Sequence, residues 1–292
     1  MHSTGIDRAQ ILGVWQADET SAKRIDVTDS DLGRFNALPG KTGIETLRGS
    51  FPDTTFDALE LEPGEYYPGM ARPIVGESPG RNPNQGGETM NRRASASGQH
   101  HALIQQLEQI CRIVHPEGSN LQTYGHEIRN VLILACTELE SQWKAILGAH
   151  KTPAENTTHY VKLCPAMKLA KYAVDFPYYP WMSECRPFDG WKNGTKDLSW
   201  YGAYNNVKHN RDDNFPQASL NNAFQALAGF FVMLCAQYGW DFALTGDAAS
   251  RAFFRLKAYP EWSLSEYYVP PYIGTLRERK YSFPTELARR SV

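Results

Sequence analysis

The groups best suited to chemistry lie in one polar run near the middle of the chain. Residues 204–213 read Tyr-Asn-Asn-Val-Lys-His-Asn-Arg-Asp-Asp. An imidazole takes up and returns a proton near neutral pH, and lysine and arginine hold a phosphate or a developing negative charge. Side-chain amides orient a hydroxyl or a water. Together these groups suit metal-free cleavage of a phosphodiester through the RNA 2′-hydroxyl, and they equally suit simple binding of a phosphate.

Helical spacing would sort these side chains onto two faces of a helix over residues 197–211. One face carries Tyr201, Asn205 and His209. The neighbouring face carries Tyr204, Lys208 and Arg211. A structural role explains the run as well, because Asn205 and His209 could hydrogen-bond across a bundle to Glu138 or Glu140 and fix the register of two helices.

The apolar pattern predicts a mainly α protein with a four-helix bundle at its core. The predicted helices cover residues 97–114, 121–148, 197–211 and 219–238. Ser97 and Ser219 are suited to begin the first and last of them, and Gly239 to end the last. Residues 149–196 are irregular, with a possible strand over 171–176.

Composition divides the chain into four parts. Residues 1–70 mix short apolar clusters with Gly and Pro, which indicates short strands and loops. Residues 71–96 are rich in Gly, Pro, Ser, Asn and Arg, which is typical of a linker or long exposed loop. We expect residues 97–245 to form the helical domain and residues 246–292 to form a loop-rich extension that packs on the bundle.

Composition also excludes several classes of protein. The net charge of −2 rules out a chain that is basic overall, so contact with an anionic polymer needs a local patch. The longest apolar run, residues 226–236, is shorter than the roughly 20 residues of a spanning helix. Five cysteines without C-x-x-C spacing indicate reduced thiols, which favours the cytoplasm and disfavours a zinc site. Because P-loop and dinucleotide-binding motifs are missing, we expect no cofactor and no metal.

The helical pattern and the motif of residues 204–209, Tyr-Asn-Asn-Val-Lys-His, resemble the HEPN superfamily. Asn205 takes the place of the polar residue that follows the family arginine, and His209 that of its histidine. Residues 124–147, with Arg129, Glu138 and Glu140, resemble the first core helix of the family. Tyr204 stands at the arginine position, so Lys208 or Arg211 would have to supply the cation. The resemblance covers residues 97–240.

The resemblance implies an all-helical, often dimeric protein that engages RNA. Many members are metal-independent endoribonucleases of toxin–antitoxin or phage-defence systems. By this resemblance His209 is the acid/base, Asn205 positions the reacting groups, and Lys208 with Arg211 binds phosphate. Tyr201, Tyr204 and Asn206 are then expected to contact the substrate. The alternative is a non-catalytic interaction module that acts through a protein partner encoded alongside it.

Overall fold

The computed structural model describes residues 13–24, 33–75, 87–239, 242, 248–269 and 279–280. The described residues form two units. The first unit takes residues 13–24, 33–65, 73–75, 263–269 and 279, and the helical unit takes residues 66–72, 87–239, 242, 248–262 and 280. The prediction of a mainly helical protein with a partly β N-terminal region is confirmed.

The predicted boundaries differ from this division. The first unit is discontinuous, because residues 263–269 of the predicted C-terminal extension belong to it. Residues 248–262 stay with the helical unit. The N-terminal residues 1–12, the linker residues 76–86 and most of the tail after Val269 lie outside the described residues.

A small sheet and one helix make up the regular part of the first unit. They are β1 (Trp15–Ala17), β2 (Ser21–Arg24), β3 (Arg34–Asn36) and α1 (Gly43–Ser50). β2 lies between β1 and β3 and is antiparallel to both. Gly43 begins α1 against β2, where an added Cβ would lie 2.0 Å from the carbonyl oxygen of Ser21. Only glycine therefore allows this close approach of helix and strand.

Backbone hydrogen bonds join residues that are distant in sequence within the first unit. Glu60 N donates to Ser265 O and Gly64 N donates to Val269 O, each at 2.8 Å. Ser265 belongs to the short 3-10 helix η5 (Leu264–Glu266). Two further short strands, β4 (Glu65–Tyr66) and β7 (Arg279–Lys280), pair with each other.

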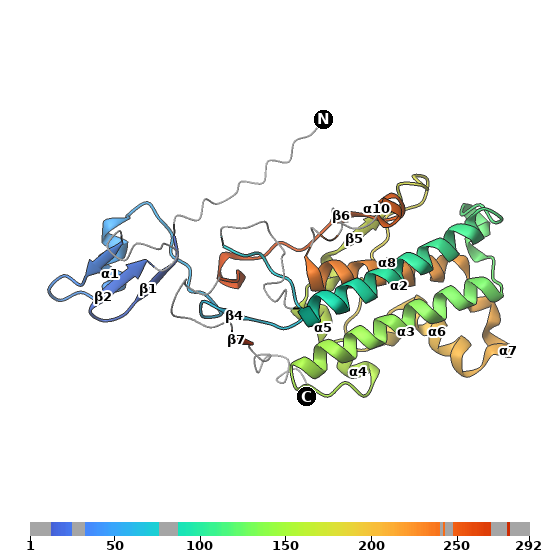
Figure 1. Ribbon diagram of the computed structural model, residues 1–292, viewed down its shortest axis with the longest axis horizontal. Coiled ribbons are helices and arrows are strands. Elements are labelled where there is room, and N and C mark those ends of the chain that lie inside the picture. Colours follow the sequence, from blue (N-terminus) through green and yellow to red (C-terminus); the bar gives the residue numbers. More distant parts are fainter. Residues whose placement is uncertain are drawn as a thin grey trace. The chain divides into compact units, whose positions relative to one another are not determined.

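Four long helices dominate the helical unit (Figure 1). They are α2 (Gly87–Cys111), α3 (His126–Ala149), α6 (Ser199–His209) and α8 (Leu220–Tyr238). α8 packs against the other three, and α3 also packs against α2 and α6. α8 begins and ends where the sequence predicts, at the N-cap Ser219 and at Gly239, whose φ is 102°. All of residues 226–238 are buried, so α8 forms the centre of the core.

α2 begins at Gly87, well before the predicted start at Ser97. Ser97 lies inside the helix, where its hydroxyl donates to Arg93 O at 2.7 Å. The extra turns contain good helix formers, and an ion pair of 2.5 Å links Glu88 to Arg92 one turn later. The glycine-rich composition just before Gly87 obscured this pattern. Residues 87–96 are therefore helix, and their assignment to a linker is wrong.

A helix that began at Ser97 would place His100 in its exposed first turn, but His100 is buried on α2. Its ring lies 5.1 Å from that of Phe230 and 5.5 Å from that of Phe254, measured between centroids. The earlier start of α2 explains the difference, since His100 then lies in the middle of the helix and faces α8. It is a core residue.

Short elements connect and follow the long helices. They are η1 (Gly118–Gln122), α4 (Thr157–Tyr160), α5 (Leu163–Ala166), η2 (Leu169–Lys171), β5 (Ala173–Asp175), η3 (Thr195–Asp197), α7 (Arg211–Asn214), η4 (Phe215–Gln217), α10 (Ala248–Phe253) and β6 (Arg255–Ala258). β5 lies within the predicted strand over residues 171–176 and pairs with β6 in antiparallel fashion.

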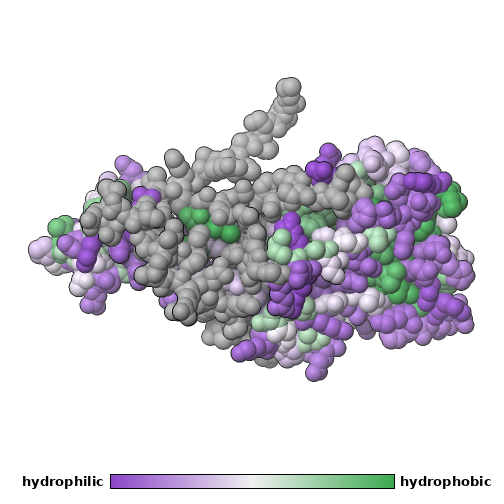
Figure 2. Space-filling view, in the orientation of Figure 1, coloured by the Kyte–Doolittle hydropathy of each residue, from purple (hydrophilic) through white to green (hydrophobic). Residues whose placement is uncertain are grey.

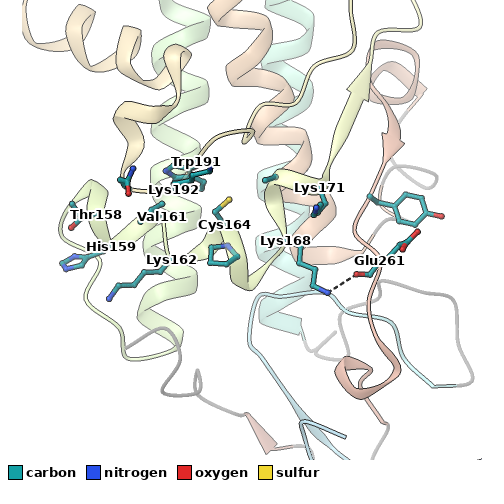
Figure 3. Close-up of a pocket in the computed structure, with 14 residues that line it drawn as sticks. Thr158, His159, Val161, Lys162, Cys164, Lys168, Lys171, Trp191, Lys192 and Glu261 are labelled. Carbon is teal, nitrogen blue, oxygen red and sulfur yellow. Dashed lines mark hydrogen bonds between the residues drawn. The ribbon is translucent and has the colours of Figure 1, made fainter. Parts of the chain in front are cut away.

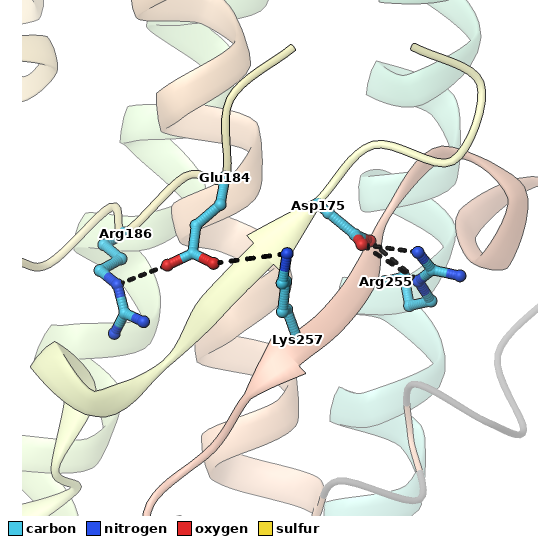
Figure 4. A network of polar contacts seen from close by, with 5 residues as sticks. All are labelled: Asp175, Glu184, Arg186, Arg255 and Lys257. Carbon is cyan, nitrogen blue, oxygen red and sulfur yellow. Dashed lines mark hydrogen bonds and ion pairs between the residues drawn. The ribbon is translucent and has the colours of Figure 1, made fainter. Parts of the chain in front are cut away.

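Ion pairs reinforce the β5–β6 pair on its solvent side (Figure 4). Arg255 contacts the Asp175 carboxylate at 2.6 Å, and Glu184 contacts both Arg186, at 2.7 Å, and Lys257, at 3.8 Å. The arginine and lysine side chains are largely exposed, so each pair contributes about 1 kcal/mol or less.

The visible face of the helical unit is mainly hydrophilic, with small hydrophobic areas between the charged side chains (Figure 2). Among the described residues, no helix combines the length and the apolar character that crossing a bilayer demands. All five cysteines are free thiols. Three of them, Cys136, Cys164 and Cys235, are buried as small apolar side chains.

Candidate functional site

The polar run occupies two helices rather than the single predicted one. α6 ends at His209, because Asn210 leaves the helical region with φ −143° and ψ 84°. The Asn210 side chain then accepts a hydrogen bond from Asp213 N and begins α7. Arg211 therefore lies on α7, and its predicted place on the same helical face as Lys208 is wrong. The helix also begins later than predicted, at Ser199 and not at Asp197. The Asp197 carboxylate instead accepts hydrogen bonds from the backbone N–H groups of Lys192 and Asn193.

Tyr201 joins α6 to α3 through a hydrogen bond inside the protein. Its hydroxyl donates to Oε1 of Glu140 at 2.5 Å, and the residue is only 1% exposed. Burial raises the pKa of Tyr201 above its usual range, and the hydrogen bond to the Glu140 carboxylate raises it further. The hydroxyl thus stays protonated and acts as a donor. The register-fixing bond expected of Asn205 or His209 is made by Tyr201 instead.

Tyr204, at the arginine position of the HEPN-like motif, is also closed to solvent. Lys208 donates to its hydroxyl at 2.7 Å, and the ammonium lies 4.9 Å from the centre of the ring. This hydrogen bond raises the pKa of Lys208, so the side chain keeps its charge. Because the faces of both tyrosine rings are buried, a ligand has no access to them in this structure.

The remaining polar residues of the run are partly or fully exposed. Asn205 is half-buried, and His209 is exposed at the end of α6. Neither side chain makes a hydrogen bond or ion pair with the described part of the chain. Asn206 donates to Oε1 of Gln217 at 2.8 Å. Arg211 is 58% exposed and lies 3.3 Å from Asp212.

The face of α6 that carries Tyr201, Asn205 and His209 thus passes from the interior to solvent along its length. Its first residue is buried against α3, and its last presents a free imidazole. Comparison of the chain with protein-family models, with curated proteins and with solved structures finds no match. The site must therefore be interpreted from its own geometry.

Metal ligation is not supported by the residues that the structure describes. They contain no group of three or more His, Cys, Asp or Glu side chains close enough to hold an ion. Glu138 and Glu140, which are two residues apart on α3, do not act as a pair. Glu140 receives the Tyr201 hydroxyl, whereas burial alone raises the pKa of Glu138. No described side chain of the polar run forms a hydrogen bond or an ion pair with Glu138.

The sequence named Glu138 and Glu140 as possible partners of α6 but did not decide between them. A carboxylate one turn after the buried Cys136 does lie on the half-buried edge of α3, and this placement is the pattern that would have found it. The aromatic residues before α6 differ in their exposure to solvent. Phe188, Trp191 and Trp200 are buried, whereas Tyr178 and Trp181 are exposed.

Tyr201→Phe is expected to lower the free energy of unfolding by about 1.5–3 kcal/mol. The change deletes the donor and leaves the largely buried Glu140 carboxylate without its short hydrogen bond. Urea denaturation measures the loss. Tyr178→Phe is the matched control, because that residue is 56% exposed and should lose less than about 0.5 kcal/mol. Equal losses in the two variants would show that the bond contributes nothing.

Proposed function

We propose that this protein engages RNA at the open end of α6 and cleaves it without a metal ion. One observation carries the proposal. The imidazole of His209 and the amide of Asn205 lie one helical turn apart, near solvent, and are not engaged by other described residues. A polar pair that fixes the register of two helices would be hydrogen-bonded to the neighbouring helix, and this pair is not bonded to any described residue.

In the proposed reaction His209 takes the proton of an RNA 2′-hydroxyl. The 2′ oxygen then forms a bond to the adjacent phosphorus, and the bond from phosphorus to the 5′ oxygen breaks. The leaving oxygen takes a proton from a second imidazole, that of His209 in another copy of the chain. The products are a 2′,3′-cyclic phosphate and a 5′-hydroxyl. Asn205 orients the attacking hydroxyl.

Cationic groups beside the imidazole would hold the phosphate. Lys208 has three N–H donors, and Tyr204 takes one of them, so two remain for a ligand. Arg211 lies two residues after His209 and is exposed. These two side chains would supply the positive charge of the family arginine, because Tyr204 stands at the arginine position in this chain. Charge on the transferring phosphoryl group is stabilised by such donors.

The packing of the helices is compatible with the HEPN resemblance. The same resemblance implies the second copy of the chain that the reaction needs. α2, α3, α6 and α8 pack as neighbours and would be the four core helices of the proposed HEPN-like domain. Composite sites in that superfamily form across two protomers, so we propose a homodimer with the two α6 ends facing each other. Membership of a toxin–antitoxin or phage-defence system belongs to the same proposal.

His209→Ala tests the proposal with RNA in the presence of EDTA. The wild type is expected to cut, and loss of general acid–base catalysis should slow cleavage by about 10²–10⁴-fold. A 2′-deoxy nucleotide at the scission point should block the reaction, because the nucleophile is missing. The measurement is the rate at which products with cyclic phosphate ends appear.

His115→Ala is the matched control, since that histidine is also exposed but lies outside the polar run. It should cut like the wild type. His209→Ala should change the free energy of unfolding by no more than about 0.5 kcal/mol, because the ring is exposed. Cleavage by neither protein, or equal cleavage by both, would remove the nuclease assignment.

A non-catalytic interaction module remains the second candidate function. The bonds from Tyr201 to Glu140 and from Lys208 to Tyr204 favour it, because the first joins α6 to α3 and the second ties a cation of the polar run to a neighbouring side chain of α6. In that case His209→Ala would weaken binding of a protein partner and leave RNA intact. Co-purification of the wild type and the variant with the product of a neighbouring gene separates the two functions.

A further inference from the structure

A cleft of about 1050 Å³ lies in the helical unit, away from the polar run of α6. Figure 3 shows its walls, which come from α4, α5 and η2, from the segment around Trp191 and from the chain after β6. The cleft shares no residue with the polar run. Its volume is at the upper end of the range for small-molecule sites.

The charge of the cleft is strongly positive. The basic side chains that line it are those of His159, Lys162, Lys168, Lys171 and Lys192. Glu261 is the only acidic residue among the lining residues. In a chain whose net charge is −2, this concentration of lysine is a local feature and not a consequence of composition. Such a surface attracts anions and raises their local concentration.

Three of these ammonium groups keep their N–H donors free of hydrogen bonds to the described residues. Lys162, Lys171 and Lys192 make no side-chain hydrogen bond or ion pair with any residue that the structure describes. Like charges around one cleft repel each other, and of these three lysines Lys192 also interacts electrostatically with the Asp197 carboxylate. An anion bound between them would remove the repulsion and satisfy the N–H donors.

Lys168 is held in place by the fold. Its φ of 51° and ψ of 38° lie in the left-handed region, which is uncommon for a residue with a side chain. Its ammonium donates to the backbone oxygen of Glu261 at 3.0 Å and lies 4.3 Å from the centre of the Trp262 ring. Unusual backbone conformations of this kind gather at ligand-binding sites. The Lys168 ammonium is thus held at this edge of the cleft by a backbone in an uncommon conformation.

The lining also offers an aromatic surface next to the lysines. Tyr259 is 45% exposed, and Trp191 is buried and forms a rigid wall. We infer that the cleft binds a nucleoside polyphosphate, with its phosphates among Lys162, Lys171 and Lys192 and its base against Tyr259. Lysines bind phosphate as point charges, and an exposed aromatic ring stacks on a planar base.

Titration calorimetry of the full-length protein with ATP tests the inference. The wild type is expected to bind ATP and, more weakly, inorganic tripolyphosphate, but not adenosine. The triple variant Lys162→Gln, Lys171→Gln, Lys192→Gln should bind ATP at least about tenfold more weakly, because hydrogen bonds to charged groups are lost. Tyr259→Ala should weaken ATP but leave tripolyphosphate unchanged. Added salt should weaken both ligands.

Lys257→Gln is the control, since that lysine lies outside the cleft and is 57% exposed. It should bind ATP like the wild type, as should His209→Ala, so failure of the proposed nuclease leaves this inference intact. Absence of ATP binding, or equal binding by the wild type and the triple variant, overturns it. Loss of RNA binding in the triple variant without any ATP binding overturns it as well and makes the cleft part of an RNA path.

Discussion

Trp143→Ala is expected to lower the free energy of unfolding by about 3–5 kcal/mol, the largest effect of any single change considered. Trp143 lies on α3 and is fully buried. Its ring is 5.0 Å from Trp191, 5.3 Å from Tyr160 and 5.5 Å from Tyr201, measured between centroids. Truncation would leave a cavity among these rings, which belong to separate segments and cannot close it without moving apart from their other neighbours.

Two variants isolate the cause of this loss. Trp181→Ala deletes the same atoms from a residue that is 47% exposed, and it should cost less than half as much. Trp143→Phe should lower the free energy of unfolding less than Trp143→Ala does, because the buried indole N–H of Trp143 has no hydrogen-bond acceptor among the described residues. Urea denaturation followed by circular dichroism measures all three. Similar losses for Trp143→Ala and Trp181→Ala would contradict the packing argument.

Acid is expected to destabilise the helical unit through His150, by up to about 3 kcal/mol. This residue follows α3, is 4% exposed, and donates from Nε2 to Pro68 O at 2.9 Å. Burial lowers its pKa from 6.5 to about 4. Between these two values the unfolded chain binds a proton that the folded protein does not. The stabilising effect is therefore complete above pH 6.5 and declines as the pH falls towards 4.

His150→Gln removes this titration and keeps an N–H donor for the Pro68 carbonyl. The free energy of unfolding is measured in urea at neutral pH and at about pH 4.5, in the wild type and in the variant. The carboxylates contribute equally to both proteins, so the difference between the two pH dependences belongs to His150. Parallel curves would show that the ring is protonated in the folded state without cost.

The long helices could be predicted because their apolar residues recur at helical spacing over many turns. α8 is the clearest case, where Ser219 and Gly239 mark both ends. The end of α6 could not be predicted. Asn210 is followed by residues that are compatible with helix, and the break depends on its side chain capping α7. A local hydrogen bond therefore decided where the imidazole of His209 meets solvent.

The candidate site was predicted in part. The spacing of Asn205 and His209 correctly placed them one turn apart on α6. It could not show that Tyr201 and Tyr204 face the interior, since an amphipathic pattern does not tell which polar residues find partners. The cleft lined by lysines could not be predicted from the sequence either. Its side chains come from segments between residues 158 and 261, and only the folded chain brings them together.

The burial of α8 on all sides has a consequence for biosynthesis. α8 is the last of the four long helices to leave the ribosome, yet it covers apolar faces of the three that precede it. A nascent chain that stops short of residue 220 therefore exposes those faces and cannot form its core. We expect C-terminal truncations before α8 to aggregate or to be degraded, and the full-length protein to acquire protease resistance only after its translation has passed Tyr238.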